Sequence, residues 1–318
     1  MGTQNPHGSL RAVNFLQLLL PDFTLILLGY LVCRYTALGR PVWEQVEALV
    51  YFFLFPVLLF HSIVRSPLDP MAASSLIGAG LALGVTGIGL AYLLPHLPGL
   101  RGRIVPREHA GAAQVAFRFN SYIALALSER LAGPEGLLAI AILIGACVPL
   151  FNVGAVWPMA RHAKTGFVRA LVRNPLIIAT ALGLAANFAG LRIPAWLEPT
   201  VTRVGGASLP LGLMAAGAGM QLAHLAQQKA LTVSLLSIRH LLLPVVAALL
   251  AVAFRLDAVQ AAVLLAFSAM PTASSCYVLA ARMGYNGAYV AGLVTLSTLL
   301  GLASLPFALG VLRPWIGA

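Results

Sequence analysis

The sequence predicts an all-α integral membrane protein with ten transmembrane helices. Of its 318 residues, 60% are hydrophobic and only 9% are charged, whereas soluble domains have about 25% charged residues. Apolar stretches of the ~20 residues that a bilayer core requires also recur along the whole chain. This composition excludes a water-soluble enzyme, a disordered regulator and a nucleic-acid-binding protein. The net charge of +11 fits the positive-inside bias of membrane proteins.

Ten apolar segments are the predicted transmembrane helices, and short connections rich in Pro, Gly and Arg separate them. They are residues 15–34, 44–64, 71–95, 109–130, 135–160, 174–191, 200–222, 230–254, 258–281 and 287–312. The polar N-terminus has a single basic residue, Arg11, so the first segment is expected to be a retained helix and not a signal peptide. The expected units are residues 1–160, a loop at 161–173 and residues 174–318.

The two units repeat the same pattern of helix-bending residues at matching offsets. These are Pro21, Gly29 and Pro56 in the first unit and Pro175, Gly183 and Pro210 in the second. Because each unit has five helices, an odd number, the second must be inserted upside down relative to the first. The sequence therefore predicts two inverted five-helix repeats, a construction that is common in secondary transporters.

Basic residues outside the segments predict the orientation. One set of connections has eleven of them and the opposite set has seven, and the largest group lies in residues 161–173. The positive-inside rule then places that loop in the cytoplasm and both termini outside. The expected location is the cell inner membrane, with the chain crossing it many times.

The predicted fourth helix has polar residues where lipid is expected. Gln114, Arg118 and Asn120 would lie near mid-membrane, followed by Ser121. A central Arg costs roughly 2.5–3.5 kcal/mol on insertion scales. The Arg118 side chain either reaches the interface or a helix C-terminus, or it faces an aqueous cavity where an anionic substrate binds.

The predicted ninth helix, the repeat counterpart of the fourth, has Pro271 near its middle, with Thr272, Ser274 and Ser275 after it. A proline removes one backbone hydrogen bond and clashes with the preceding turn. The result is either a plain kink, with the freed groups bonded by Ser and Thr, or an unwound segment. If both helices are unwound at these equivalent positions, their half-helix N-termini and free carbonyls come together at mid-membrane and form a site for a carboxylate.

Other polar residues give weaker signals. Asn152 faces the same cavity or bonds a neighbouring helix. Asp22 is the only acid placed well inside a segment, and it is either a coupling or gating group or the partner of an Arg. His240 is expected at the membrane interface. The sequence has no zinc-protease motif, nucleophile elbow, Walker loop or metal-spaced Cys pair. We therefore expect no enzyme activity, no cofactor and no metal.

Four motifs occur in order along nearly the whole chain: RFNSYIAL at 118–125, NPLI at 174–177, ASLPLGL at 207–213 and PTAS at 271–274. Together they resemble the bacterial branch of the auxin efflux carrier family. The resemblance implies ten helices in two inverted repeats, with helices 4 and 9 broken and crossing near the substrate. It also implies a scaffold of helices 1, 2, 6 and 7, a mobile domain of the other helices, and an elevator-like movement. It also implies an organic anion as substrate, which is auxin for plant members and malate or malonate for bacterial ones.

Within this resemblance, Asn120 matches the crossover Asn of helix 4 and Pro271 matches the crossover Pro of helix 9. Plant members tend to have Pro immediately before that Asn, whereas this chain has Phe119 there, preceded by Arg118. The difference favours a small mono- or dicarboxylate over auxin.

The leading hypothesis is a secondary carrier of a small organic anion in the lipid bilayer. The expected substrate-site residues are Arg118, Asn120, Ser121, Asn152, Pro271, Thr272, Ser274 and Ser275. A passive channel or pore for small anions is the alternative, and saturable flux with counterflow would exclude it. A receptor without transport is a third class. Substrate identity, direction, coupling ion and oligomeric state, with a homodimer among the options, are left open.

Overall fold

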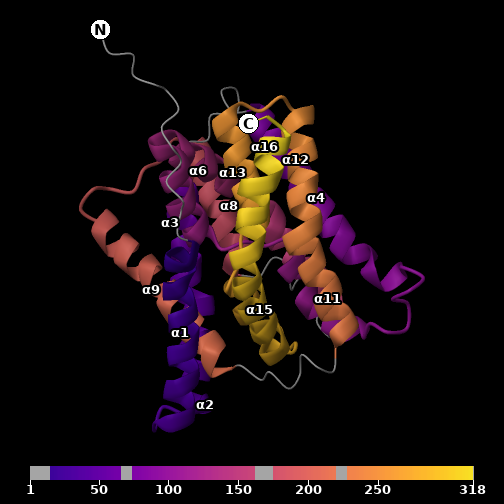
Figure 1. Cartoon of the computed structure of the whole chain (residues 1–318). Helices are drawn as coiled ribbons and strands as arrows, with labels where there is room; N and C mark the ends of the chain where they lie inside the picture. Colours follow the sequence, from indigo (N-terminus) through magenta and orange to yellow (C-terminus); the bar gives the residue numbers. More distant parts are fainter. Residues whose placement is uncertain (1–14, 66–73, 162–174, 220–227, 318) are drawn as a thin grey trace.

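The computed structural model describes residues 15–65, 74–161, 175–219 and 228–317, and within these ranges every regular element is a helix (Figure 1). The predicted loop at 161–173, apart from Arg161, and the N-terminal residues 1–14 lie outside the described residues. Helices lie over all ten predicted segments. The number of membrane crossings and the inverted repeat stay predictions.

The first predicted unit contains a run of helices with several interruptions. In chain order they are α1 (Phe15–Tyr35), α2 (Arg40–Leu49), the π-helical turn η1 (Val50–Leu54), α3 (Phe55–Arg65), α4 (Ser74–Leu93), the 3-10 turn η2 (Leu94–His96), α5 (Pro106–Ala112), the 3-10 turn η3 (Ala113–Ala116) and α6 (Ser121–Arg161). The long α6 is divided at Ala132 and Gly133, where Gly133 has a φ of 58°. Glycine adopts such a φ without a steric penalty. This division lies at the predicted boundary between helices 4 and 5.

The second unit has the same kind of interruptions. Its helices are α8 (Pro175–Phe188), α9 (Glu198–Ala218), α11 (Lys229–Ser237), the π-helical turn η4 (Ile238–Leu242), α12 (Leu243–Ala253), α13 (Ala258–Ala269), α14 (Ser275–Arg282), α15 (Gly287–Pro306), the π-helical turn η5 (Phe307–Leu312) and α16 (Arg313–Trp315).

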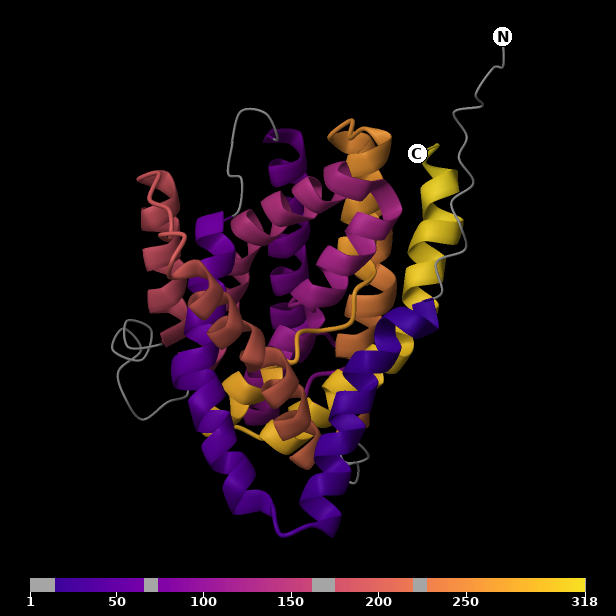
Figure 2. The same cartoon turned by 90° about the vertical axis from the view of Figure 1, so that its left-hand side faces the viewer.

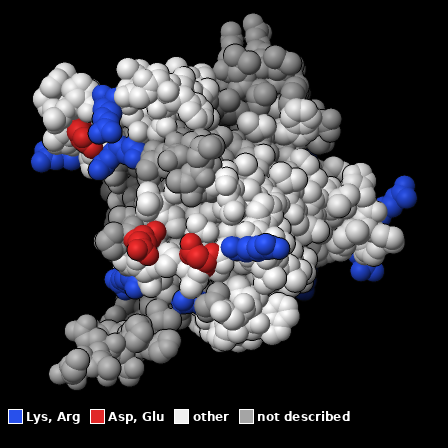
Figure 3. Space-filling view, turned by 90° about the horizontal axis from the view of Figure 1, so that it is seen from above, with Lys and Arg blue, Asp and Glu red and all other residues white. Residues whose placement is uncertain are grey.

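The outside of the bundle is apolar, which is the pattern of a protein surrounded by lipid. Large side chains such as Phe52, Leu182 and Val252 are more than half exposed. Figure 3 looks down on the end of the bundle, where charged side chains lie in a few places with uncharged residues between them. Among the described residues, five stretches are long and apolar enough to cross a bilayer. They are Arg40–Arg65, Ser74–His96, Leu138–Ala160, Lys229–Ala253 and Gly287–Trp315. The chain is a multi-pass membrane protein.

One group of helices comprises α1, α2, α3, α8 and α9. Figure 2 shows α1 and the α2–α3 run as the two arms of a V joined at its lower end. Helix α1 packs along α9, and α3 packs along α8. The contact between α1 and α9 depends on glycine, because a Cβ on Gly29 would overlap the backbone of Met214 and one on Gly217 would overlap that of Ile26. Small residues that let helix backbones approach closely are typical of membrane helix interfaces.

The remaining helices form a second group around α13, which is buried almost along its whole length. Helix α13 contacts α6, α12 and α4, and α14 packs on α15. Both interrupted segments described below belong to this group, so the fold gathers them in the interior of the bundle.

Candidate functional site

The two breaks predicted in helices 4 and 9 meet inside the protein. The chain is not helical from Phe117 to Asn120, between η3 and α6, or from Met270 to Ser274, between α13 and α14. The backbone N–H of Asn120 donates a hydrogen bond to the carbonyl of Pro271, with 2.9 Å between the atoms. The two segments therefore cross in direct contact, with all nine residues buried.

An aromatic cluster packs the crossing on one side. The ring of Phe119, from the first break, lies 4.3 Å from that of Phe267, in the last turn of α13. Phe151 of α6 contacts both rings, with centroids 6.0 and 6.2 Å away. Phe119 is thus a packing residue on this side of the crossing.

Arg118 lies at the crossing, is only 5% exposed, and bonds neutral side chains. Its Nη1 donates to Oε1 of Gln114 at 2.9 Å, and its Nη2 donates to Oδ1 of Asn152 at 3.3 Å. Among the described residues no carboxylate pairs with it, since every described ion pair involves Glu44, Glu47 or Glu198. Arg118 therefore places a positive charge in the protein interior without a described counter-charge. The sequence left open that the Arg118 side chain reaches the membrane interface or a helix C-terminus. Its described side-chain hydrogen bonds go instead to Gln114 and Asn152.

Gln114 connects the two breaks. Its Nε2 donates to the carbonyl of Cys276, the second residue of α14, and to that of Gly111, each at 3.0 Å. Its Oε1 accepts from Arg118 at the same time. The sequence placed Gln114 near mid-membrane but did not assign it to the site.

The N-termini of α6 and α14 both begin at the crossing. Asn120 is placed to cap α6, since its Oδ1 accepts from the backbone N–H of Ile123 at 3.3 Å. Ser274 precedes α14 and makes no side-chain cap. The N-terminal end of a helix has a partial positive charge and free N–H groups. Together with Arg118, these two ends give the crossing a positive character suited to an anion.

The other predicted site residues are distributed as follows. Asn152 is 1% exposed and touches Arg118, and Thr272 is 1% exposed and lies in the second break. Ser274 and Ser275 are buried at the start of α14, but no described contact joins them to Arg118. Ser121 is half-buried at the first residue of α6. Asp22 lies in α1, and its side chain is outside the described residues.

The sequence analysis missed two residues on η4 that contact the second break. Arg239 is 1% exposed and donates to the carbonyls of Phe267 and Met270. His240, expected at the membrane interface, is instead 4% exposed and bonds Ser297 and Ser304 of α15. The signal in the sequence is a charged and a titratable residue side by side within the apolar segment 230–254. Ionisable residues inside membrane segments are rare and generally functional.

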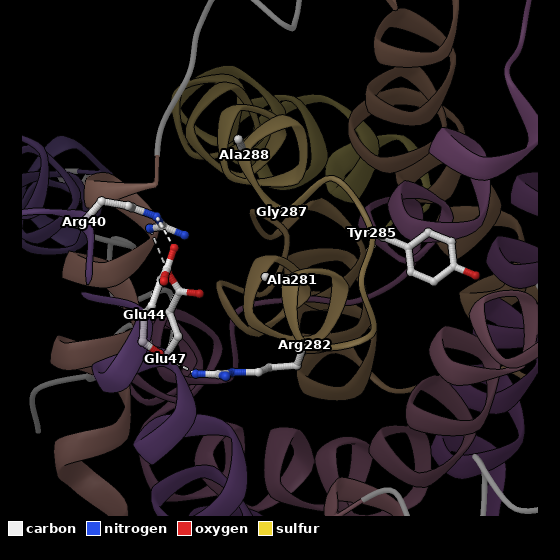
Figure 4. Close-up of a pocket in the computed structure, with 8 residues that line it drawn as sticks. All are labelled: Arg40, Glu44, Glu47, Ala281, Arg282, Tyr285, Gly287 and Ala288. Atoms are coloured by element: carbon white, nitrogen blue, oxygen red, sulfur yellow. Dashed lines mark hydrogen bonds and ion pairs between the residues drawn. The ribbon is translucent and has the colours of Figure 1, made fainter. Parts of the chain in front are cut away.

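A polar pocket of about 300 Å³ lies between α2 and the α14–α15 turn (Figure 4). Arg40, Glu44 and Glu47 lie on one wall, and Arg282 lies on the other. Glu47 is 3% exposed, its Oε1 is 2.8 Å from Nη1 of Arg40, and it also accepts a hydrogen bond from the hydroxyl of Tyr277. Arg282 donates to the carbonyl of Glu44. Glu47, near the start of segment 44–64, is thus a buried carboxylate that the sequence analysis did not single out.

The pocket and the crossing are neighbours through α14. Tyr277, which bonds Glu47, directly follows Cys276, whose carbonyl bonds Gln114. A chain of polar contacts thus runs from Arg118 to the pocket. Within the described residues, no group of three or more His, Cys, Asp and Glu could hold a metal ion. The arrangement is suited to binding and releasing an anion.

Comparison with known proteins finds a transporter family and two transporter relatives. A family model described as "Membrane transport protein" matches residues 106–309, a range that includes both breaks. A protein of Rhizobium meliloti (strain 1021) named "Putative malonate transporter" is 25% identical over 313 residues, which cover 93% of this chain and 95% of that protein. An "Uncharacterized transporter" of Methanothermobacter thermautotrophicus is 25% identical over 289 residues, covering 89% and 93%.

Proposed function

This chain belongs to the membrane transport protein family, the auxin efflux carrier family that its motifs resemble, and we propose that it carries a small carboxylate by elevator-type alternating access. It is a transporter and not an enzyme. Malonate is the first candidate substrate, because a relative that covers nearly the whole chain is named for malonate.

The observation that carries the proposal is the environment of Arg118. A guanidinium in a membrane interior is expensive, and the described partners of Arg118 are neutral amides. A carboxylate bound at the crossing would neutralise the positive charge of Arg118 and gain charge-assisted hydrogen bonds in a low-dielectric site. The proposed site residues are Arg118, Asn120, Ser121, Asn152, Pro271, Thr272, Ser274 and Ser275, as expected from the sequence.

We propose the topology of two inverted five-helix repeats, residues 1–160 and 174–318, joined by a cytoplasmic loop at 161–173. Helix packing supports it. The repeat exchanges helix 1 with helix 6 and helix 2 with helix 7, so the packing of α1 on α9 corresponds to that of α8 on α3. Both pairs have extensive packing contacts, as the repeat requires. The two broken helices are likewise repeat partners.

The elevator movement is proposed between the two groups of helices described above. Contacts are dense within each group and sparse between them, so one group could slide on the other without unpacking its own core. Contacts that do join the groups include Glu47 with Tyr277 and Glu44 with Arg282. In this mechanism these polar contacts break when the substrate site moves. Asp22, on the stationary group, is assigned a structural or gating role.

A passive channel is the alternative. It requires a continuous aqueous path along the crossing, whereas Phe117, Phe119 and the second break are all buried. The carrier is therefore favoured over the channel.

Two measurements test the proposal. Purified protein is screened by thermal shift against mono- and dicarboxylates, because a ligand that binds only the native state stabilises it by about 2.7 kcal/mol at a hundred times its Kd. Proteoliposomes are then assayed for saturable uptake and for counterflow of the hit. A carrier shows both, whereas a pore shows flux that does not saturate and no counterflow. If no carboxylate stabilises the protein and none is transported, the proposal is wrong.

A further inference from the structure

A buried arginine that lies outside the two broken helices forms hydrogen bonds to the backbone at the second break. Arg239 lies on η4 and is fully buried, with 1% of its surface exposed. Its Nε donates to the carbonyl of Met270 at 2.7 Å, and its Nη2 donates to that of Phe267 at 3.0 Å. These carbonyls lie at the C-terminal end of α13, where backbone acceptors have no partner within the helix. One planar guanidinium thus fixes both of them in a defined geometry.

His240, next to Arg239, holds the other backbone groups of the break through two serines. Ser304 donates to the carbonyl of Ala269 at 2.8 Å, and Ser297 accepts from the N–H of Thr272 at 2.8 Å. His240 bonds Ser304 through Nδ1 and Ser297 through Nε2, each at 2.8 Å.

The directions of these bonds fix the tautomer of a neutral imidazole. Since the Ser304 hydroxyl gives its hydrogen to Ala269, Nδ1 of His240 must donate to Ser304. A neutral imidazole then accepts from Ser297 through Nε2. The network is therefore fully satisfied with a neutral His240.

Between Phe267 and Thr272, four backbone groups are bonded from the η4 and α15 side: the carbonyls of Phe267, Ala269 and Met270 and the N–H of Thr272. A further carbonyl of the segment, that of Pro271, accepts from the backbone N–H of Asn120 on the opposite side. In a membrane interior no water is at hand to bond such groups, so their partners determine the shape of the segment.

We infer that Arg239 is a positioning residue of the substrate site: with His240, Ser297 and Ser304 it clamps residues 267–272 in the conformation that binds the anion. The inference rests on the proposed function, since it concerns the same site. Arg239 acts through the backbone and not by touching the substrate, because its described bonds go to carbonyls.

The first test measures the Kd for malonate in detergent for wild type, Arg239→Gln, Arg239→Lys and the control Arg203→Gln. Arg203 is exposed on α9, away from the break. Both Arg239 variants should weaken binding, the Gln variant by about tenfold or more, because binding groups displaced by ~1 Å lose their alignment. Lysine keeps the charge but cannot donate to both carbonyls as guanidinium does, so it should restore binding only in part.

The second test does not depend on the substrate. In a Cys33→Ser, Cys147→Ser background, the rate of alkylation of Cys276 by N-ethylmaleimide reports opening of the break, since Cys276 is 0% exposed and lies five residues beyond Pro271. Both Arg239 variants should speed this reaction, whereas Arg203→Gln should not. In the reciprocal Cys33→Ser, Cys276→Ser background, Cys147, which is also 0% exposed but lies on α6, should stay unreactive.

The outcomes are distinct. Wild-type affinity and wild-type Cys276 reactivity in a folded Arg239→Gln protein would refute the clamp. Full restoration by lysine would mean that charge alone matters, and equal exposure of Cys147 would mean general destabilisation; both overturn the inference. If Arg239→Gln does not fold, Ser304→Ala removes the bonds of Ser304 to Ala269 and to Nδ1 of His240, leaves those of Arg239, and gives a milder version of the same two readouts. If wild type binds no carboxylate, the proposed function fails, and Cys276 reactivity still decides the clamp.

Discussion

Replacing Arg118 by Gln tests the candidate site most directly. Gln keeps a polar amide but removes the positive charge that a bound carboxylate would meet. A hydrogen bond to a charged group contributes about 1.5–3 kcal/mol. At about 1.4 kcal/mol for each factor of ten in affinity, the variant should bind the carboxylate roughly 10- to 100-fold more weakly.

The substitution should leave the unliganded protein folded, because two effects oppose each other. Removing a buried charge relieves the cost of its burial, about 2.5–3.5 kcal/mol on insertion scales. Against this, Gln114 and Asn152 lose the donor that Arg118 gives them, and each unsatisfied buried acceptor costs about 1–3 kcal/mol. Gln114 keeps its bonds to Gly111 and Cys276, so the link between the two breaks persists.

The assay is ligand-induced thermal shift for affinity, with size-exclusion chromatography and the unliganded melting temperature as controls for folding. Arg118→Lys keeps the charge but not the planar fork, and should give an intermediate loss. Arg203→Gln, a charge removal on the exposed face of α9, should bind as wild type does. A well-folded Arg118→Gln protein with wild-type affinity would refute the reasoning that places the substrate at Arg118.

Three further predictions concern the cap, the topology and the coupling. Asn120→Ala removes the cap of α6 and should lower the free energy of unfolding by about 1 kcal/mol and reduce transport; unchanged values of both would contradict the role of Asn120. In a background without native cysteines, a cysteine at Lys164 should be protected from an impermeant thiol reagent in intact cells and one at Thr3 should react, and the opposite pattern would reverse the orientation. Asp22→Asn should leave the effect of a pH gradient on uptake into proteoliposomes unchanged, because a carboxylate on the stationary group cannot travel with the substrate; if the substitution abolishes that effect while sparing exchange, Asp22 is the coupling site.

Much of the fold could be predicted from the sequence because each signal was local. Apolar length determines the helices, and helices lie over all ten predicted segments. The second break could be anticipated because a proline cannot continue a helix, and the first because Arg118 and Asn120 are too polar for a lipid-facing position. The contact between the breaks, through Asn120 and Pro271, could not be obtained from local signals. It depends on how α6 and α13 pack, and the family resemblance alone implied it.

The residues that the sequence analysis missed are polar residues whose hydrogen-bond partners lie far away in the sequence. Arg239 and His240 lie in an apolar segment, and their partners are backbone carbonyls around residue 270 and serines near residue 300. Glu47 was passed over because it begins a segment, and its partner Tyr277 is 230 positions away. A hydropathy pattern records that such residues are present but not that their bonds are made elsewhere in the fold.

The two halves of the crossing use their buried arginines differently, and this difference indicates where anion recognition resides. In the first half Arg118 belongs to the break itself, and its described bonds go to side-chain amides, which can rearrange around a ligand. In the second half Arg239 stands on a neighbouring helix, and its described bonds go to two carbonyls that leave the adjoining backbone little freedom. A group that must exchange partners with the substrate in every transport cycle needs replaceable bonds, whereas a group that maintains the shape of the site needs permanent ones. The substrate charge should therefore be recognised from the first half, while the second half offers a fixed surface. This division predicts that variants of Arg118 change which anions bind, whereas variants of Arg239 weaken all of them alike.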